Sequence, residues 1–141
     1  EGKITAETEL AEIIDAMHRQ SREIFSVKRV ERYLLDTEDA VALQDEIGAL
    51  KAATGSPFVI QLHDIFDEPE FTYIVMEKLC GGTLLGQIGE KRCFSENEAR
   101  SVARRVLNGL EHMHSRRIAH RNIQCETLIL LQEGSKMTNK Q

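Results

Sequence analysis

Lys28 is the first residue of the chain whose type and surroundings point to chemistry. It lies within EIFSVKRV (23–30), whose β-branched and aromatic residues in rough alternation predict a strand. A lysine inside an apolar strand is costly unless its ammonium group is paired. A paired cation could hold the α- and β-phosphates of a nucleotide. The alternative is a surface lysine on the open face of the strand, and the residues alone leave both open.

Glu46 is a second candidate residue, a carboxylate within a predicted helix. It lies in DTEDAVALQDEIGALKAATG (36–55), where the apolar residues Leu43, Ile47 and Leu50 share one helical face. Asp36 or Thr37 can cap the start of this helix, and Gly55 can end it. Glu46 stands at the edge of the apolar stripe, so a solvated helix glutamate is the alternative interpretation.

The strands and helices that must position these side chains follow from local patterns. FVIQLHDIF (58–66) and FTYIVMEKL (71–79) predict two strands, and the turn residues 67–69 between them predict a hairpin. Gly81-Gly82 predicts a flexible joint, followed by a short apolar helix at about 84–88. The clearest helix is 94–117, because Ser95 and Glu98 form a capping-box pattern and Ala99, Ala103, Val106, Leu110 and Met113 share one face. Residues 118–127 predict a loop and 128–131 a short strand.

Composition limits the classes of function. The 141 residues are 41% hydrophobic and 29% charged, as in an ordinary soluble domain, and no apolar run approaches the roughly 18–20 residues that span a bilayer. The chain begins at Glu1, with no signal peptide at its start as given, and we expect it to be a piece of a longer protein. The three cysteines form no C-x-x-C, which predicts no disulfide framework or zinc site and a reducing, cytoplasmic location.

Charge is distributed unevenly along the chain. Residues 1–79 hold 8 Lys/Arg and 17 Asp/Glu, a net charge of −9, whereas residues 80–141 hold 10 and 6, a net charge of +4. Two differently charged subregions, or a chance scatter of solvated charge, would give this split. The basic part lacks interleaved aromatic residues, so we expect no nucleic-acid partner, and we expect no membrane partner.

Histidines 112, 114 and 120 have no obvious carboxylate partner. Residues two apart point to different sides of a helix, so we expect no metal site at these histidines.

The chain resembles the first part of a protein kinase domain, closest to the Ser/Thr calcium/calmodulin-dependent group, over about residues 21–133. Four segments carry the resemblance in the family's order: FSVKRV, DEIGALKA, YIVMEKLCGGTL and the catalytic-loop-like HRNIQCET. The resemblance implies an α+β fold in which residues 1–79, with a helix at about 38–53, form a small antiparallel-sheet lobe and hinge. Residues 80–141 would be the start of a mainly helical lobe, ending before a D-F-G.

The resemblance also implies roles for single residues. Lys28 would bind ATP phosphates with Glu46 as its partner, Met76 would limit the back of the adenine pocket, and the backbones of Glu77 and Leu79 would bind the adenine edge.

The N-terminal segment allows two interpretations. Leu10, Ile13, Ile14 and Met17 have helical spacing, which predicts a helix at about 8–19, whereas family geometry favours a β-hairpin over the phosphates, and we favour the hairpin. Its glycine-rich loop is hardly recognisable, because EGKITAETELAE keeps only Gly2.

The catalytic loop departs from the family pattern at three positions. Asn122 replaces the catalytic aspartate, and an amide can orient a hydroxyl group but cannot act as a base. Gln124 replaces the lysine that steadies the transferred phosphate, and Thr127 replaces an asparagine that ligates magnesium. We therefore expect a kinase-like domain that binds ATP weakly, makes doubtful use of magnesium and is catalytically impaired. The alternatives are a fragment of an active Ser/Thr kinase, a nucleotide-independent interaction module for an unknown protein partner, and a non-functional remnant.

Overall fold

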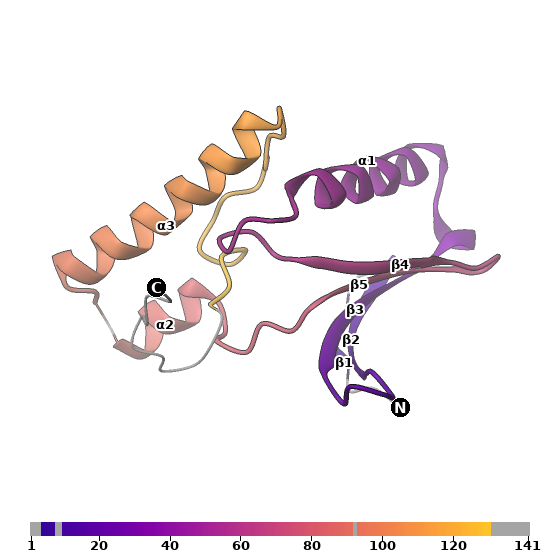
Figure 1. Cartoon of the computed structure of the whole chain (residues 1–141), viewed down its shortest axis with the longest axis horizontal. Coiled ribbons are helices and arrows are strands. Elements are labelled where there is room, and N and C mark those ends of the chain that lie inside the picture. Colours follow the sequence, from indigo (N-terminus) through magenta and orange to yellow (C-terminus); the bar gives the residue numbers. More distant parts are fainter. Residues whose placement is uncertain (1–3, 8–9, 92, 131–141) are drawn as a thin grey trace.

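A computed structural model describes residues 4–7, 10–91 and 93–130 of the chain. In these residues a sheet with one helix occupies one side of the molecule and two further helices occupy the other (Figure 1). The elements in chain order are β1 (Ile4–Glu7), β2 (Ala11–Met17), β3 (Ile24–Glu31), the 3-10 helix η1 (Arg32–Leu34), α1 (Thr37–Ala53), β4 (Leu62–Asp67), β5 (Phe71–Glu77), α2 (Leu84–Lys91) and α3 (Glu96–Ser115). This α+β architecture agrees with the fold class expected from the sequence.

The sheet is antiparallel and has the strand order β1-β2-β3-β5-β4. β3 pairs with two long neighbours, so that Lys28 lies between Ile13 of β2 and Ile74 of β5. The N-terminal segment is therefore a pair of strands, as family geometry predicts, and the helix predicted from local periodicity at 8–19 is wrong over residues 10–17. Residues 8 and 9 lie outside the described part. All seven residues of β2 pair with β3. The free energy gained from this pairing exceeds the local preference for a helix that the spacing of the apolar side chains indicates.

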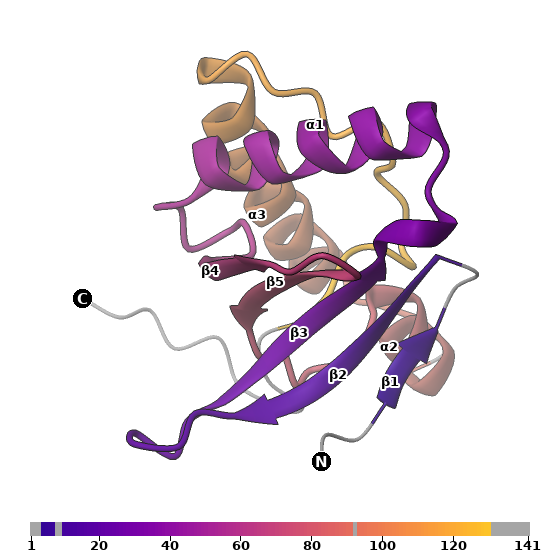
Figure 2. The same ribbon diagram turned by 90° about the vertical axis from the view of Figure 1, so that its right-hand side faces the viewer.

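The core of the sheet half lies between the sheet and α1, which crosses one face of the sheet (Figure 2). Its buried members are Val30, Leu43, Ile47, Ile74 and Met76. Leu43 and Ile47 are the residues that the helical periodicity places on the buried face, so the sequence identified this face correctly. Asp36 caps α1 by accepting the amide hydrogen of Asp39 at 2.8 Å.

The helical half contains α2 and α3. The capping box of α3 is formed as predicted: the Ser95 side chain accepts the Glu98 amide hydrogen, and the Glu98 carboxylate accepts that of Ser95. The apolar face is only partly covered in the described structure, because Gly109 and Met113 are buried whereas Ala99 and Ala103 are exposed. Within the described ranges, no helix is both long enough and apolar enough to span a bilayer.

Two strand predictions need correction. β4 begins at Leu62, and residues 58–61 precede it as irregular chain rather than as part of the strand predicted at 58–66. Residues 128–130 form no separate strand; Ile129 makes an isolated antiparallel bridge with Thr83, and residue 131 lies outside the described part. In the first segment, the Gln61 backbone amide donates to the Glu77 carboxylate at 2.8 Å instead of to a strand carbonyl. In the second, the Leu130 amide donates to Gly82 O at 2.9 Å.

Candidate functional site

Lys28 and Glu46 form an ion pair between the middle of β3 and α1. Lys28 Nζ lies 2.7 Å from both carboxylate oxygens of Glu46. The side chain of Lys28 is 24% exposed and that of Glu46 is 43% exposed, so the pair lies at the edge of the core and is open to solvent. The lysine therefore points to the α1 side of the sheet, and the geometry disagrees with the open-face alternative. Its ammonium group can still meet an anion from the solvent side.

Met76, Glu77 and Leu79 mark the end of β5 and the start of the connection to the helical half. Met76 is a member of the core cluster. The amide of Glu77 donates to Gln61 O at 3.0 Å, and the carboxylate of Glu77 accepts the amide hydrogen of Gln61 at 2.8 Å. Glu77 thus also holds the irregular segment before β4, a structural task that the sequence did not reveal. Leu79 is half-buried beyond the end of the strand.

A second ion pair, which sequence reasoning missed, joins this connection to β2. Lys78 Nζ lies 2.6 Å from Asp15 Oδ1, and both side chains are about three-quarters buried. The two residues are 63 positions apart, so no local pattern could have paired them. The contact stabilises the position of the β2–β3 hairpin relative to the connection.

Thr127 closes the loop that contains Asn122 and Gln124. Its hydroxyl oxygen lies 2.8 Å from Asn122 O and 3.1 Å from Gln124 O, and accepts the Gln124 amide hydrogen at 3.3 Å. Because a hydroxyl group has one hydrogen, it donates to one carbonyl at a time. Asn122 and Gln124 expose their side chains. Sequence reasoning treated Thr127 only as a replaced metal ligand; the tendency of threonine to bond nearby backbone was the available signal.

Backbone hydrogen bonds attach this loop to the connection and to α2. The Gly81 amide donates to Leu130 O at 2.9 Å, and the Leu130 amide donates to Gly82 O at 2.9 Å. The Leu85 amide donates to Cys125 O at 3.0 Å. A Cβ at Gly81 would lie only 2.5 Å from Leu130 Cβ, which explains why the close approach needs glycine.

The candidate site therefore has two separately built parts. Within the described residues no hydrogen bond or ion pair joins Lys28 or Glu46 to residues 120–128. Among all the residues that the structure describes, no group of three or more His, Cys, Asp or Glu side chains could hold a metal ion. The first part offers a cation for an anionic group, and the second offers neutral amides and a hydroxyl group that is already hydrogen-bonded.

The order of these features is that of a kinase-like chain: a strand lysine paired with a helix glutamate, a connection between two lobes, and a loop after a long helix. The protein kinase domain family matches residues 7–138, and the chain belongs to this family.

Curated relatives place the chain near the calcium/calmodulin-dependent group of Ser/Thr kinases. It is 35% identical over 112 residues to ribosomal protein S6 kinase alpha-4 of Mus musculus, covering 79% of this chain and 14% of the relative. It is 30% identical over 113 residues to myosin light chain kinase A of Dictyostelium discoideum, covering 80% of this chain and 38% of that relative. A third relative, the MAP kinase-interacting serine/threonine-protein kinase 2 of Xenopus laevis, is 36% identical over 84 residues, covering 60% of this chain and 18% of the relative. The chain thus spans well under half the length of these relatives.

Proposed function

We propose that the chain is a Ser/Thr kinase-like domain that binds a nucleotide weakly and does not transfer phosphate efficiently. The observation that carries the proposal is the Lys28–Glu46 pair, which is formed at 2.7 Å in a chain whose catalytic-loop positions hold Asn122, Gln124 and Thr127. The pair supports binding of nucleotide phosphates. Asn122, Gln124 and Thr127 supply no base, cation or carboxylate at these three positions for the chemical step.

The magnitude of the expected impairment follows from the chemistry of Asn122. Loss of a general base costs on the order of 10²–10⁴ in rate. Replacement of a lysine by neutral Gln124 removes electrostatic stabilisation as well. Magnesium fits these residues poorly, because Thr127 offers one neutral oxygen that already takes part in the hydrogen bonds of its own loop.

The test is a thermal-shift titration with ATP and ADP, with and without magnesium. A ligand that binds only the folded state stabilises it by about 2.7 kcal/mol at 100 times its dissociation constant. We expect a magnesium-independent shift that Lys28→Ala abolishes and the matched variant Lys51→Ala retains, because Lys51 is an exposed lysine in the last turn of α1. A cooperative melt with no shift would leave a nucleotide-independent interaction module or a remnant.

A second candidate is a fragment of an active Ser/Thr kinase, which the names of the relatives favour. A peptide-phosphorylation assay on the chain, and on any longer protein that contains it, separates the two. Phosphate transfer that requires Lys28 would contradict the proposed impairment. An intracellular location and an as yet unidentified protein partner belong to the same proposal and await localisation and pull-down experiments.

A further inference from the structure

A hollow of about 400 Å³ opens at the end of the sheet where β3 begins and β5 ends. It is separate from the contact between Lys28 and Glu46. Its lining comes from three segments of the sheet half: Glu23, Ile24, Phe25, His63, Glu77 and Lys78. Because β3, β4 and β5 are hydrogen-bonded neighbours in the sheet, the hollow is built on a rigid framework rather than on a loop alone.

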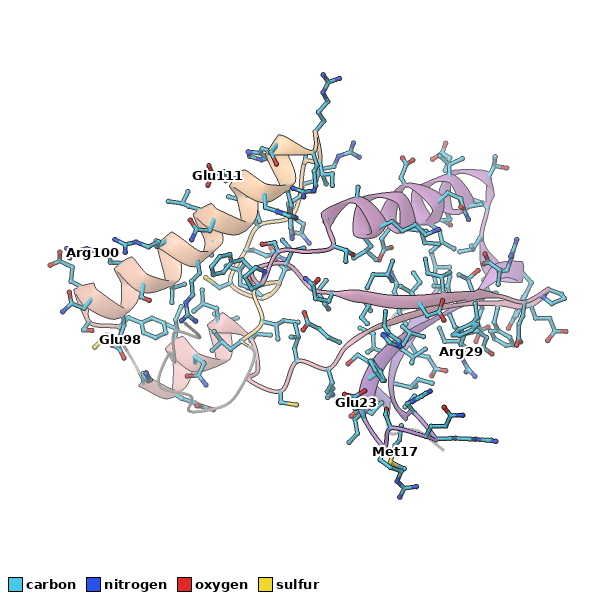
Figure 3. All side chains as sticks on the ribbon, in the orientation of Figure 1. Met17, Glu23, Arg29, Glu98, Arg100 and Glu111 are labelled. Atoms are coloured by element: carbon cyan, nitrogen blue, oxygen red, sulfur yellow. The ribbon has the colours of Figure 1, made fainter. Side chains whose placement is uncertain are left out.

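Flat and apolar side chains form part of the hollow. The rings of Phe25 and His63 stack with centroids 4.5 Å apart and an angle of 25° between their planes. Ile24 is 56% exposed, and Met17, its register partner on β2, is 50% exposed. Figure 3 shows Met17 and Glu23 at the same end of the β2–β3 hairpin. Of Ile24 and Met17, only Ile24 lies in the lining of the hollow, beside the aromatic stack.

The charge of the hollow is negative. The Glu23 carboxylate accepts a hydrogen bond from the Ser21 hydroxyl at 3.0 Å, and the Glu77 carboxylate accepts one from the Gln61 amide at 2.8 Å. Both donors are neutral, and neither carboxylate has an ion pair within the described residues. The one cation in the lining, Lys78, is paired with Asp15. Two uncompensated carboxylates therefore flank an aromatic stack.

We propose that this hollow binds the guanidinium group of an arginine in a basic peptide segment of a partner protein, with an apolar neighbour of that arginine against Ile24. A guanidinium group is planar, can stack on a ring face and can donate two parallel hydrogen bonds to a carboxylate. A lysine ammonium group is a compact, strongly hydrated point charge and uses such a surface less well. The same negative charge disfavours phosphates, nucleic acids and anionic lipid surfaces. The inference does not rest on nucleotide binding.

The test uses NMR titration of the whole chain with the blocked peptide acetyl-Gly-Arg-Leu-Gly-amide. Analogues with lysine or citrulline in place of arginine report the need for the guanidinium shape and for its charge. We expect saturable shifts at Phe25, His63 and Glu77 with the arginine peptide, weaker binding of the lysine peptide and none of the citrulline peptide. Glu23→Gln should raise Kd about tenfold, the effect of losing one charge-assisted hydrogen bond.

A matched control is available at the other end of β5. Glu70→Gln removes the same charge just before Phe71, the strand end opposite Glu77, and should leave Kd within twofold. Equal weakening by Glu70→Gln, equal binding of the three peptides, or shifts that avoid the hollow would overturn the proposal. Because Glu23 is exposed, its variant should fold, and a melting curve confirms this. Lys28 does not line the hollow, so Lys28→Ala should bind the arginine peptide as the native chain does. The same variant should lose the nucleotide-induced thermal shift, so the two proposals can fail independently.

Discussion

The Lys28–Glu46 pair illustrates how little a contact's geometry says about its contribution to folding. Both hydrogen bonds are 2.7 Å long, yet both side chains are partly exposed. Ion pairs in such surroundings typically contribute about 0–1 kcal/mol, because solvent screens the charges. The pair therefore matters more for presenting an ammonium group of defined position than for holding α1 on the sheet, whose buried apolar residues stabilise that contact.

Thr127 is the residue for which a structural role can be separated from a chemical one. Thr127→Val keeps the shape of the side chain and removes its hydroxyl group, so the bonds with Asn122 O and the Gln124 amide are lost. We expect a destabilisation of about 1 kcal/mol. Hydrogen exchange at residues 122–128 should accelerate, whereas Thr127→Ser should retain protection. Unchanged exchange in the valine variant would contradict the bracing role.

At the residue scale, the resemblance to the kinase family named a partner that residue types alone left open. It implied that Glu46 pairs with Lys28, and the structure forms this ion pair. The sequence could not reveal that Glu77 holds Gln61 or that Asp15 holds Lys78, because these contacts depend on how distant segments meet. That Asn122 and Gln124 impair phosphate transfer stays a prediction.

Among the elements, β2 and α3 show when local patterns suffice. α3 carries its own start signal, and its capping box formed as predicted. β2 has helical spacing of apolar residues but gains its backbone hydrogen bonds from β3, so a local signal misleads there. The pairing partner is 11 or more residues away for most of the strand, beyond the window in which periodicity is read.

The N-terminus of α3 should respond to acid. The Ser95 amide, then the Lys91 ammonium group and the Ser95 hydroxyl, stabilise the Glu98 carboxylate and lower its pKa from 4.5 to about 2. Because the pKa is lower in the folded state, this carboxylate's contribution to stability is complete above pH 4.5 and is lost as the pH falls towards 2. The difference in melting temperature between the native chain and Glu98→Gln should shrink over this range. Carboxyl NMR titration checks the pKa directly, and a midpoint near 4.5 would refute it.

Replacing Gly81 in the joint between the lobes should destabilise the fold, whereas replacing Gly86 in α2 should not. Gly81→Ala places a Cβ within 2.5–2.7 Å of Leu130 side-chain and backbone atoms, so the two segments must separate. We expect a loss of roughly 1–3 kcal/mol, as for other overpacked sites. Gly86→Ala in α2 is the control, since its nearest neighbour is Thr83 Oγ1 at 3.4 Å. Denaturant unfolding of both variants measures the difference, and equal stabilities would argue against the close approach.

At the scale of the whole molecule, α3 contacts the end of α1 through His112. The imidazole Nε2 lies 2.9 Å from Ala53 O, and Nδ1 lies 3.1 Å from the Arg116 guanidinium group. Because arginine can only donate, Nδ1 accepts and Nε2 donates to the carbonyl. Nearby, Gly109 approaches Phe58 so closely that an added Cβ would lie 3.1 Å from Phe58 O. The helical half is thus attached to the turn that follows α1.

Replacing His112 should loosen this attachment. His112→Phe keeps a ring and removes the hydrogen bond to Ala53 O, with an expected cost of about 1 kcal/mol. His114→Phe is the matched control, because His114 is exposed on the same helix. Hydrogen exchange at residues 53–61 should increase in the first variant and stay unchanged in the second. Identical exchange in both would show that the contact does not hold the halves together.

The arrangement of the two halves was the least accessible feature from the sequence. The Gly81-Gly82 joint and the uneven charge indicated two parts, but the contacts that place them join residues 53 with 112, 58 with 109 and 81 with 130. Each pairing uses a backbone carbonyl, which every residue type possesses. No side-chain pattern could therefore have identified these partners.

The same backbone hydrogen bonds have an evolutionary consequence. Amides and carbonyls of residues 81–85 hold the loop around Asn122 irrespective of which side chains the loop carries. Substitutions at positions 122 and 124 can thus accumulate under neutral drift without disturbing the path of the chain. A lineage that stops selecting for phosphate transfer can keep the shape of its ancestor's machinery, and that shape remains available for selection on binding alone.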